Sequence, residues 1–156
     1  MGRRTGAVLV SLLLLLTLAV SASAAAVKMT VGVRFWRESG DKESMADSAV
    51  DTTREATLTR QPNGTFTLEL PVKQVSSMNM TGRLTGISIG EVNYDGTLSG
   101  DLSDGTAVLT LKNLPASVLT GSDSNKALAV TCSIKMDTIL LGDITTSAKM
   151  SIWVER

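Results

Sequence analysis

Apolar and polar residues alternate along most of this 156-residue chain, with the period of two that is typical of half-buried β-strands. The pattern is clearest in Val27, Met29, Val31, Val33 and Phe35, which share one face of a strand. Further strands are predicted at 55–60, 65–70, 83–89, 91–94, 106–112, 127–136 and 144–154. Because each strand has one apolar and one polar face, we expect antiparallel sheets that cover a single core.

Turn residues separate these strands. Asn63-Gly64 lies between two alternating runs and predicts a β-hairpin, whose second strand is limited by Pro71. Pro115 favours one helical turn over 114–119. Seven to nine short strands at this spacing predict an all-β domain, a sandwich or a barrel, that spans residues 27–156.

The segment 37–53 is polar and lacks strand alternation. Met45 lies within it, in a place where a hydrophobic core does not require a thioether. A soft and adaptable side chain there either covers a ligand or packs over the end of a sheet as an ordinary loop residue.

Residues 1–26 have the order of a secretory signal peptide. Arg3 and Arg4 precede an apolar run over 7–20, and small residues follow over 21–26. The run is shorter than the roughly 20 residues of a membrane span, so we expect cleavage after Ala24 or Ala26. The sequence therefore predicts a protein that is secreted or held in the cell envelope, with no membrane span in its mature form.

Charge and cysteine content narrow the class of function. The 15 basic and 15 acidic residues balance, and without Arg3 and Arg4 the mature chain has 13 against 15, a net charge of −2. This balance argues against a nucleic-acid partner. Cys132, the only cysteine, shares one face of its predicted strand with apolar residues, so it is expected to be a buried small hydrophobe.

Residues that carry common catalytic chemistry are missing. The chain has no histidine, and it contains no nucleophile elbow, phosphate-binding glycine loop or zinc spacing. Asp95, Asp101 and Asp104 do not have the spacing of a calcium loop and predict turns. We therefore expect a protein that is not an enzyme. Trp36 and Trp153 fall on the polar faces of their strands and are expected to shield the outer sheet face.

Three sequence segments resemble the NEAT (near-iron transporter) domains of bacterial surface proteins. They are Ser44-Met45-Ala46-Asp47, which is similar to the family's 3-10 lip, the hairpin of Ala56-Thr57-Leu58 with 63–70, and the stretch 80–87. The residue-level match covers about 50 residues of the chain. NEAT domains are immunoglobulin-like antiparallel β-sandwiches, here of 7–9 strands, and many bind haem and serve iron uptake at the cell surface.

The resemblance implies a candidate haem site. If the family's site residues are transferred to this chain, Ser44 would hydrogen-bond a haem propionate, and Met45 would ligate or cover the iron. The family's haem binders usually place a Tyr-x-x-x-Tyr pattern on the last strand, and this chain has no tyrosine there. Thr146 and Met150 share a face at the equivalent spacing, so Met150 is a candidate thioether ligand opposite Met45. The implied partner is haem or a haem-carrying protein.

Two alternatives remain open at this point. The segment 81–102 also resembles the calycin-like β-barrel domains of exported bacterial proteins. The missing tyrosine pattern equally allows a ligand-free structural or adhesive module, or an exported domain with a ligand other than haem.

Overall fold

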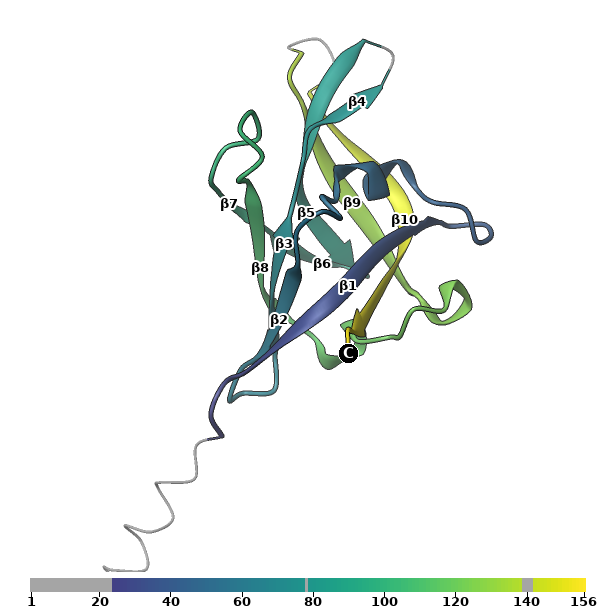
Figure 1. Ribbon diagram of the computed structural model, residues 1–156. Coiled ribbons are helices and arrows are strands. Elements are labelled where there is room, and N and C mark those ends of the chain that lie inside the picture. The colour runs from purple at the N-terminus through teal and green to yellow at the C-terminus, as the bar shows by residue number, and fades with distance from the viewer. Residues whose placement is uncertain (1–23, 78, 139–141) are drawn as a thin grey trace, which may run out of the picture.

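The computed structural model describes residues 24–77, 79–138 and 142–156, which form an all-β domain of antiparallel strands (Figure 1). Three short 3-10 turns lie between the strands. The elements in chain order are β1 (Val27–Arg37), η1 (Met45–Ala49), β2 (Ala56–Arg60), β3 (Phe66–Pro71), β4 (Val75–Ser77), β5 (Met80–Ile89), β6 (Val92–Asp95), β7 (Thr97–Ser99), β8 (Val108–Leu114), η2 (Ala116–Val118), η3 (Ser124–Lys126), β9 (Leu128–Met136) and β10 (Asp143–Val154).

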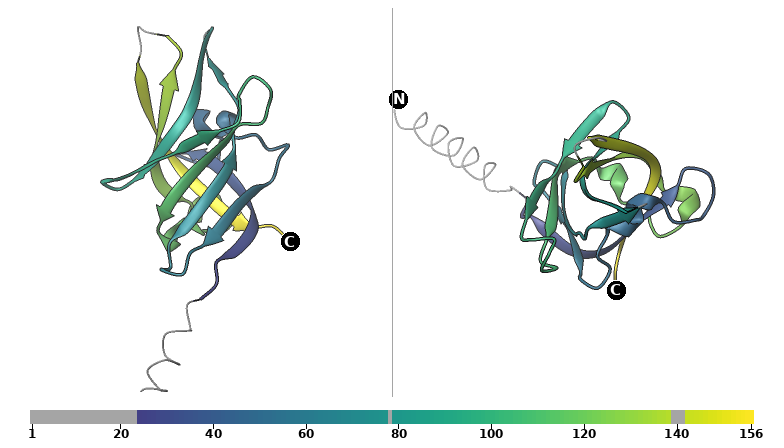
Figure 2. Two further views of the ribbon diagram at one scale, coloured as in Figure 1. Left: turned by 90° about the vertical axis from the view of Figure 1, so that its left-hand side faces the viewer. Right: turned by 90° about the horizontal axis from the view of Figure 1, so that it is seen from above.

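The strands follow the order β4-β5-β9-β10-β1-β2-β3-β8-β7, and β6 pairs with β5. Strand β1 joins the two layers of the sandwich, one on its β10 side and one on its β2 side. Its residues Val27–Val31 pair with β2, whereas Val31–Arg37 pair with β10. The sheet curls over its core in both views of Figure 2. Among the described residues β4 and β7 do not pair with each other, so the sheet is not a closed barrel. The architecture is the expected immunoglobulin-like antiparallel sandwich, and its described residues form ten strands where seven to nine were expected.

A second crossing between the layers lies at Gly96. Strand β6 pairs with β5, and after Gly96 the chain continues as β7 beside β8. The Gly96 N–H donates to the Thr85 carbonyl at 2.8 Å. A Cβ at Gly96 would lie 2.3 Å from Leu109 Cδ1, so only glycine allows this bend to pack on the core.

The predicted alternation builds the core. Burying these apolar side chains supplies the main driving force for folding. Cys132 is also fully buried, and burial raises the pKa of its thiol to about 12, as expected for a small hydrophobe. The largest side chains below 2% exposure are Phe35, Leu58, Leu68, Leu70, Leu84, Ile87, Leu109, Leu111, Leu114, Ile134, Met150 and Ile152.

The two tryptophans lie on the outer face of β1 and β10, as the sequence predicts. Trp153 lies against Gly32, where a Cβ would be 2.2 Å from the indole ring. The Trp36 Nε1–H donates to Ser151 Oγ at 2.9 Å, and Ser151 is fully buried. The indoles thus cover this part of the sheet.

The segments between strands agree with the turn residues in most places. Strand β3 ends at Pro71, and η2 follows Pro115. The strand predicted to end at Lys112 is longer, because β8 continues to Leu114. Residues 1–23, which hold most of the expected signal peptide, lie outside the described part of the chain. In the described part, no helix has both the length and the apolar character needed to cross a bilayer.

Candidate functional site

The polar segment after β1 folds into η1, as local chemistry favours. Ser44 is its N-cap, and its Oγ accepts from the Ala46 N–H at 3.3 Å. The turn places Ala46 and Ala49 inward, both fully buried, whereas Met45 stays 39% exposed. This end of the sandwich is therefore covered by a short turn with small residues inside and a thioether outside.

Turn η1 takes the place of a strand beside the second half of β1. Strand β2 leaves β1 at Val31, so the backbone of Phe35 has no strand partner on that side. The Phe35 carbonyl accepts from the Ser44 N–H at 2.9 Å, and the Phe35 N–H donates to Asp47 Oδ1 at 2.8 Å. Two hydrogen bonds thus fix η1 against the sheet.

Charged groups surround this attachment. Arg34 lies 3.2 Å from a Glu43 oxygen through Nη1 and 3.9 Å from Asp47 Oδ2 through Nε. Burial raises the pKa of Asp47, and the Phe35 hydrogen bond and the Arg34 charge offset part of that rise. Ionised Asp47 is therefore held by specific partners, at a cost in solvation.

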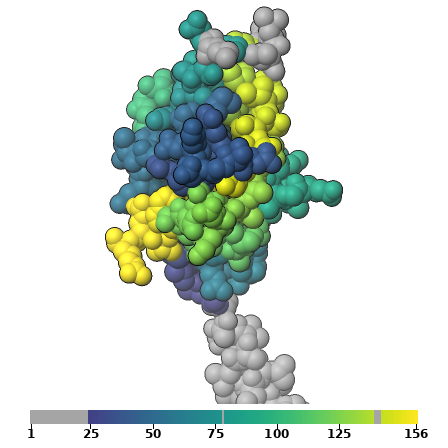
Figure 3. Space-filling model, turned by 90° about the vertical axis from the view of Figure 1, so that its right-hand side faces the viewer, coloured from purple at the N-terminus to yellow at the C-terminus, as the bar shows by residue number. Residues whose placement is uncertain are grey.

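A cleft of about 510 Å³ lies over the outer side of η1. Figure 3 shows this face, with the dark blue residues around η1 beside the yellow C-terminal strand. Among the described residues, Lys73 forms no ion pair. The charged side chains that line the cleft are Arg34, Arg37 and Lys73 against Glu43 and Asp47, and Ser44 and Met45 line it beside them.

The structure brings some of the predicted site residues together and separates others. Ser44 is 7% exposed and lines the cleft together with Met45. Thr146 is half-buried on the inner face of β10, opposite Cys132. Met150 is fully buried opposite Phe35, so it could reach an iron atom only if the core opened. The register therefore makes Met150 a core residue.

Sequence reasoning missed several residues at this end of the molecule. Arg34, Arg37 and Lys73 lie far apart in the chain, and only the fold places them around one cleft. Arg34 lies on the polar face of its alternating strand, and this position was an available signal. Lys73 comes after Pro71, outside any alternating run, so no pattern in the sequence indicated it.

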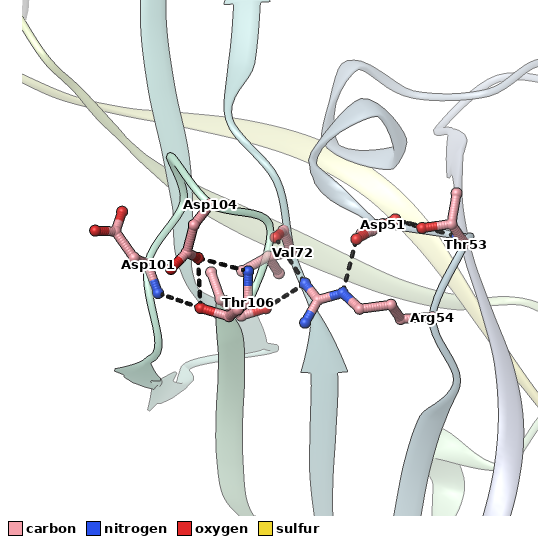
Figure 4. A network of polar contacts seen from close by, with 8 residues as sticks. Asp51, Thr53, Arg54, Val72, Asp101, Asp104 and Thr106 are labelled. Atoms are coloured by element: carbon pink, nitrogen blue, oxygen red, sulfur yellow. Dashed lines mark hydrogen bonds and ion pairs between the residues drawn. The ribbon is translucent and has the colours of Figure 1, made fainter.

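The segment after η1 is anchored by Arg54 (Figure 4). Its Nη2 donates to the Ala107 carbonyl at 2.7 Å and to the Val72 carbonyl at 3.4 Å, and its Nε lies 2.8 Å from Asp51 Oδ2. Hydrogen bonds from the Thr53 side chain and from Arg54 lower the pKa of Asp51 to about 2. This network connects residues 51–54, which follow η1, to Val72 at the end of β3 and to Ala107 before β8.

Of the three aspartates considered for calcium, Asp101 and Asp104 form turns as expected, whereas Asp95 is the last residue of strand β6 and forms no turn. Asp101 Oδ1 accepts from the Ser103 N–H at 2.8 Å, and Asp104 Oδ1 accepts from the Thr106 N–H at 3.0 Å. Within residues 24–77, 79–138 and 142–156, no group of three metal-binding side chains is present. Asp101, Asp104 and Thr106 in Figure 4 therefore shape the loop between β7 and β8.

Comparison with known proteins gives one informative likeness. No family model matches the chain, and no curated protein matches it. A solved structure of a mutant IsdX2-NEAT5 domain in complex with heme is similar with a TM-score of 0.51. The match has 12% sequence identity and covers 85% of this chain and 99% of that chain. At this identity the likeness shows the fold alone, which is that of a NEAT-like β-sandwich.

Proposed function

We propose that this chain is an exported NEAT-like domain that binds haem at the η1 end and is not an enzyme. The observation that carries the proposal is the 3-10 turn η1, fixed to β1 beside a cationic cleft. The similar solved domain is described in complex with heme, which supports the choice of ligand. In this role the domain would take haem from, or pass it to, a haem-carrying protein.

The residues of the cleft fit the charge of haem. Each haem carries two propionates, and the cleft holds Arg34, Arg37 and Lys73 against the carboxylates of Glu43 and Asp47, both of which lie beside Arg34. Ser44 Oγ already accepts one hydrogen bond, and its own proton is free to donate to a carboxylate. Charge-assisted bonds of this kind are stronger than neutral ones. The cleft thus offers both charge and a positioned donor for a propionate.

The apolar part of the ligand needs cover, and Met45 supplies it. Its exposed side chain projects from a turn that two backbone contacts hold in place. A thioether there covers the porphyrin or ligates its iron, which supplies redox chemistry when bound. Thr146 does not line the cleft, so it would contact the ligand only if the ligand also reached the inner face of β10. Met150 would take part only after the core around Phe35 had opened.

Titration of hemin into the purified chain, read at the Soret band, tests this function. We expect saturable binding that Met45→Ala weakens about tenfold, because a buried methionine contributes about 1.5 kcal/mol or more. Met29→Ala is the matched control. Met29 lies in the first half of β1, where it pairs with Leu58 of β2, and not in the second half, where η1 is attached. Met150→Ala is expected to lower stability and leave the Soret position unchanged.

Each other outcome has a defined meaning. A Soret shift in both Met45→Ala and Met150→Ala would show that both thioethers reach the iron. Equal affinity in Met45→Ala, Ser44→Ala and the unmodified chain would place the ligand elsewhere. A titration without a saturable Soret band would overturn haem binding and favour a structural or adhesive module.

A further inference from the structure

A second hollow surface lies between β6 and β8. The two strands are neighbours, but β6 pairs with β5, whereas β8 pairs with β3 and β7. They diverge from the crossing at Gly96 and leave a cleft of about 410 Å³. Its walls come from β6, from Thr97 on β7 and from β8, and the lining residues are Val92, Asn93, Tyr94, Asp95, Thr97, Thr110, Lys112 and Asn113.

A further cleft of about 440 Å³ adjoins the first. Lys112 and Asn113 line both clefts and so lie at their junction. The outer part of the second cleft comes from the β2–β3 hairpin and includes Gln61, Asn63, Thr65 and Thr67. We call the two clefts together the β6–β8 trough.

A β-bulge sets the junction of the trough. Phe66 pairs with Leu114 and Leu68 with Leu111, so β8 has one residue more than β3 between these pairs. Asn113 takes a left-handed backbone with φ 60°. As a result Lys112 and Asn113 are both exposed, although they are consecutive, while Leu111 and Leu114 are fully buried. Bulges of this kind redirect side chains and are frequent beside functional sites.

The chemistry of the trough indicates an uncharged polar ligand. Amides and threonine hydroxyls dominate its walls, and its two charges, on Asp95 and Lys112, cancel. The single cation disfavours a phosphate or polyanion, and the polar walls disfavour a lipid. Tyr94, the only tyrosine, lines the first cleft and is half-buried because part of its side chain packs against the core, and Pro62 lines the second cleft.

We infer that the β6–β8 trough is a binding site for an oligosaccharide of more than one sugar unit. Sugar hydroxyls both donate and accept hydrogen bonds, which suits amide and hydroxyl walls, and sugar C–H faces pack on aromatic rings. The bulge contributes the central amide and ammonium of the site. The trough is independent of the cleft at η1, and none of its residues lines that cleft.

Amide chemical-shift titrations with cellotetraose, chitotetraose and glucose test the site without haem. We expect tetrasaccharide-dependent shifts at 93–95, 110–113 and 61–67, and weaker shifts with glucose. Asn113→Gly should weaken binding about tenfold, because it removes the central amide while glycine keeps the left-handed backbone. Asn79→Gly is the matched control, since Asn79 is the other left-handed non-glycine residue, with φ 63°.

Two outcomes would overturn the inference. The first is the absence of shifts in the trough with both tetrasaccharides at millimolar concentration, or equal shifts in the Asn113→Gly and unmodified chains. The second is a response to an extended polythreonine peptide in place of the sugars, which would make the open edges of β6 and β8 a peptide-pairing site. Tyr94→Phe should retain most of the affinity if the ring provides the packing surface.

Discussion

The two ends of this sandwich are closed by similar turns that are attached in different ways. Turn η1 buries Ala46 and Ala49, and η2 buries Val118 at the other end (Figure 1). Carboxylates and guanidinium groups hold the η1 end through Asp47 and Arg54. At the η2 end the Thr120 and Gly121 N–H groups donate to the Ile152 carbonyl.

This difference in attachment distinguishes the η1 end, which has the features of a binding site, from the η2 end, which only covers the core. Met45 at η1 and Leu119 after η2 are each 39% exposed. Met45 lies in a cleft with three cations and two carboxylates, whereas the η2 end is held by backbone groups and one hydroxyl. An exposed apolar residue gains functional meaning from the charges around it. The predictions below test whether the η1 end depends on its charged groups as strongly as its contacts indicate.

The largest effect is expected from Arg54→Ala. The substitution removes the Arg54 donors from the Ala107 and Val72 carbonyls and from Asp51 Oδ2, although Ala107 keeps the Val72 N–H and Asp51 keeps Thr53, so we expect a loss of about 2–3 kcal/mol in unfolding free energy. Urea unfolding measures it. Arg60→Ala, which removes an exposed arginine at the far end of β2, should cost less than about 0.5 kcal/mol. Equal losses in the two variants would remove the contrast between the ends.

Asp47→Ala is expected to cost about 2 kcal/mol, because it leaves the Phe35 N–H without its acceptor and releases η1. Asp47→Asn retains an acceptor oxygen and should recover most of this loss. The matched control is Asp123→Ala, which removes an exposed aspartate that caps η3. If Asp123→Ala proved as costly as Asp47→Ala in urea unfolding, the attachment of η1 would not be special.

A smaller effect is expected at the other end. Thr120→Val removes the hydroxyl that accepts from the Ile152 N–H at 3.3 Å, and we expect a loss of about 1 kcal/mol. Thr120→Ser keeps the hydroxyl and should stay close to the unmodified chain. The loss in Thr120→Val should not change between pH 3 and pH 7, because the site contains no titrating partner. A loss above that of Asp47→Ala would reverse the proposed ranking.

A smaller effect on unfolding free energy is expected at acid pH, where Asp51 beside η1 becomes protonated. The folded-state pKa of Asp51 lies at about 2, below its ordinary value of 3.8. A lowered carboxyl pKa contributes stability above the unfolded value, and this contribution is lost as the pH falls through the folded value. The unfolding free energies of the unmodified chain and Asp51→Asn should therefore differ by about 1 kcal/mol or less at pH 5 and converge toward pH 2. A gap that widens in acid would contradict the assignment.

Thiol labelling measures the smallest change. Cys132 is fully buried with its thiol pKa raised to about 12, so the folded chain should resist a water-soluble disulfide reagent at pH 8. Release of η1 by Asp47→Ala should accelerate labelling more than Thr120→Val does. The rate in denaturant provides the reference for full exposure. Fast labelling of the unmodified chain would show that the core opens without any change at η1.

Much of the fold was predictable from local pattern. Alternation indicated the strands, Asn63-Gly64 the hairpin and Pro71 the end of β3. The polar segment 37–53 was expected to be irregular, and Ser44 now caps η1 within it. These features depend on residues close together in the chain, which fix backbone geometry and the side that each side chain faces.

The candidate site was predictable only in part. Ser44 and Met45 could be proposed from their segment, but Thr146 and Met150 share a strand face and differ in burial, because Met150 lies opposite Phe35. That difference comes from the pairing of β1 with β10, between segments more than one hundred residues apart. Sequence periodicity gives the face of a residue and carries no information on how deep in the sheet it lies.

The sequence by itself determined an all-β chain with one core, a buried Cys132 and a polar segment suited to cover one end. Only the tertiary structure decided that β1 serves both layers, that Arg34 and Lys73 meet at one cleft, and that a bulge turns Asn113 outward. Local pattern is set by steric and solvation preferences of neighbouring residues. A site gathers distant residues, and their distances follow from register and from the way the sheet curls over its core.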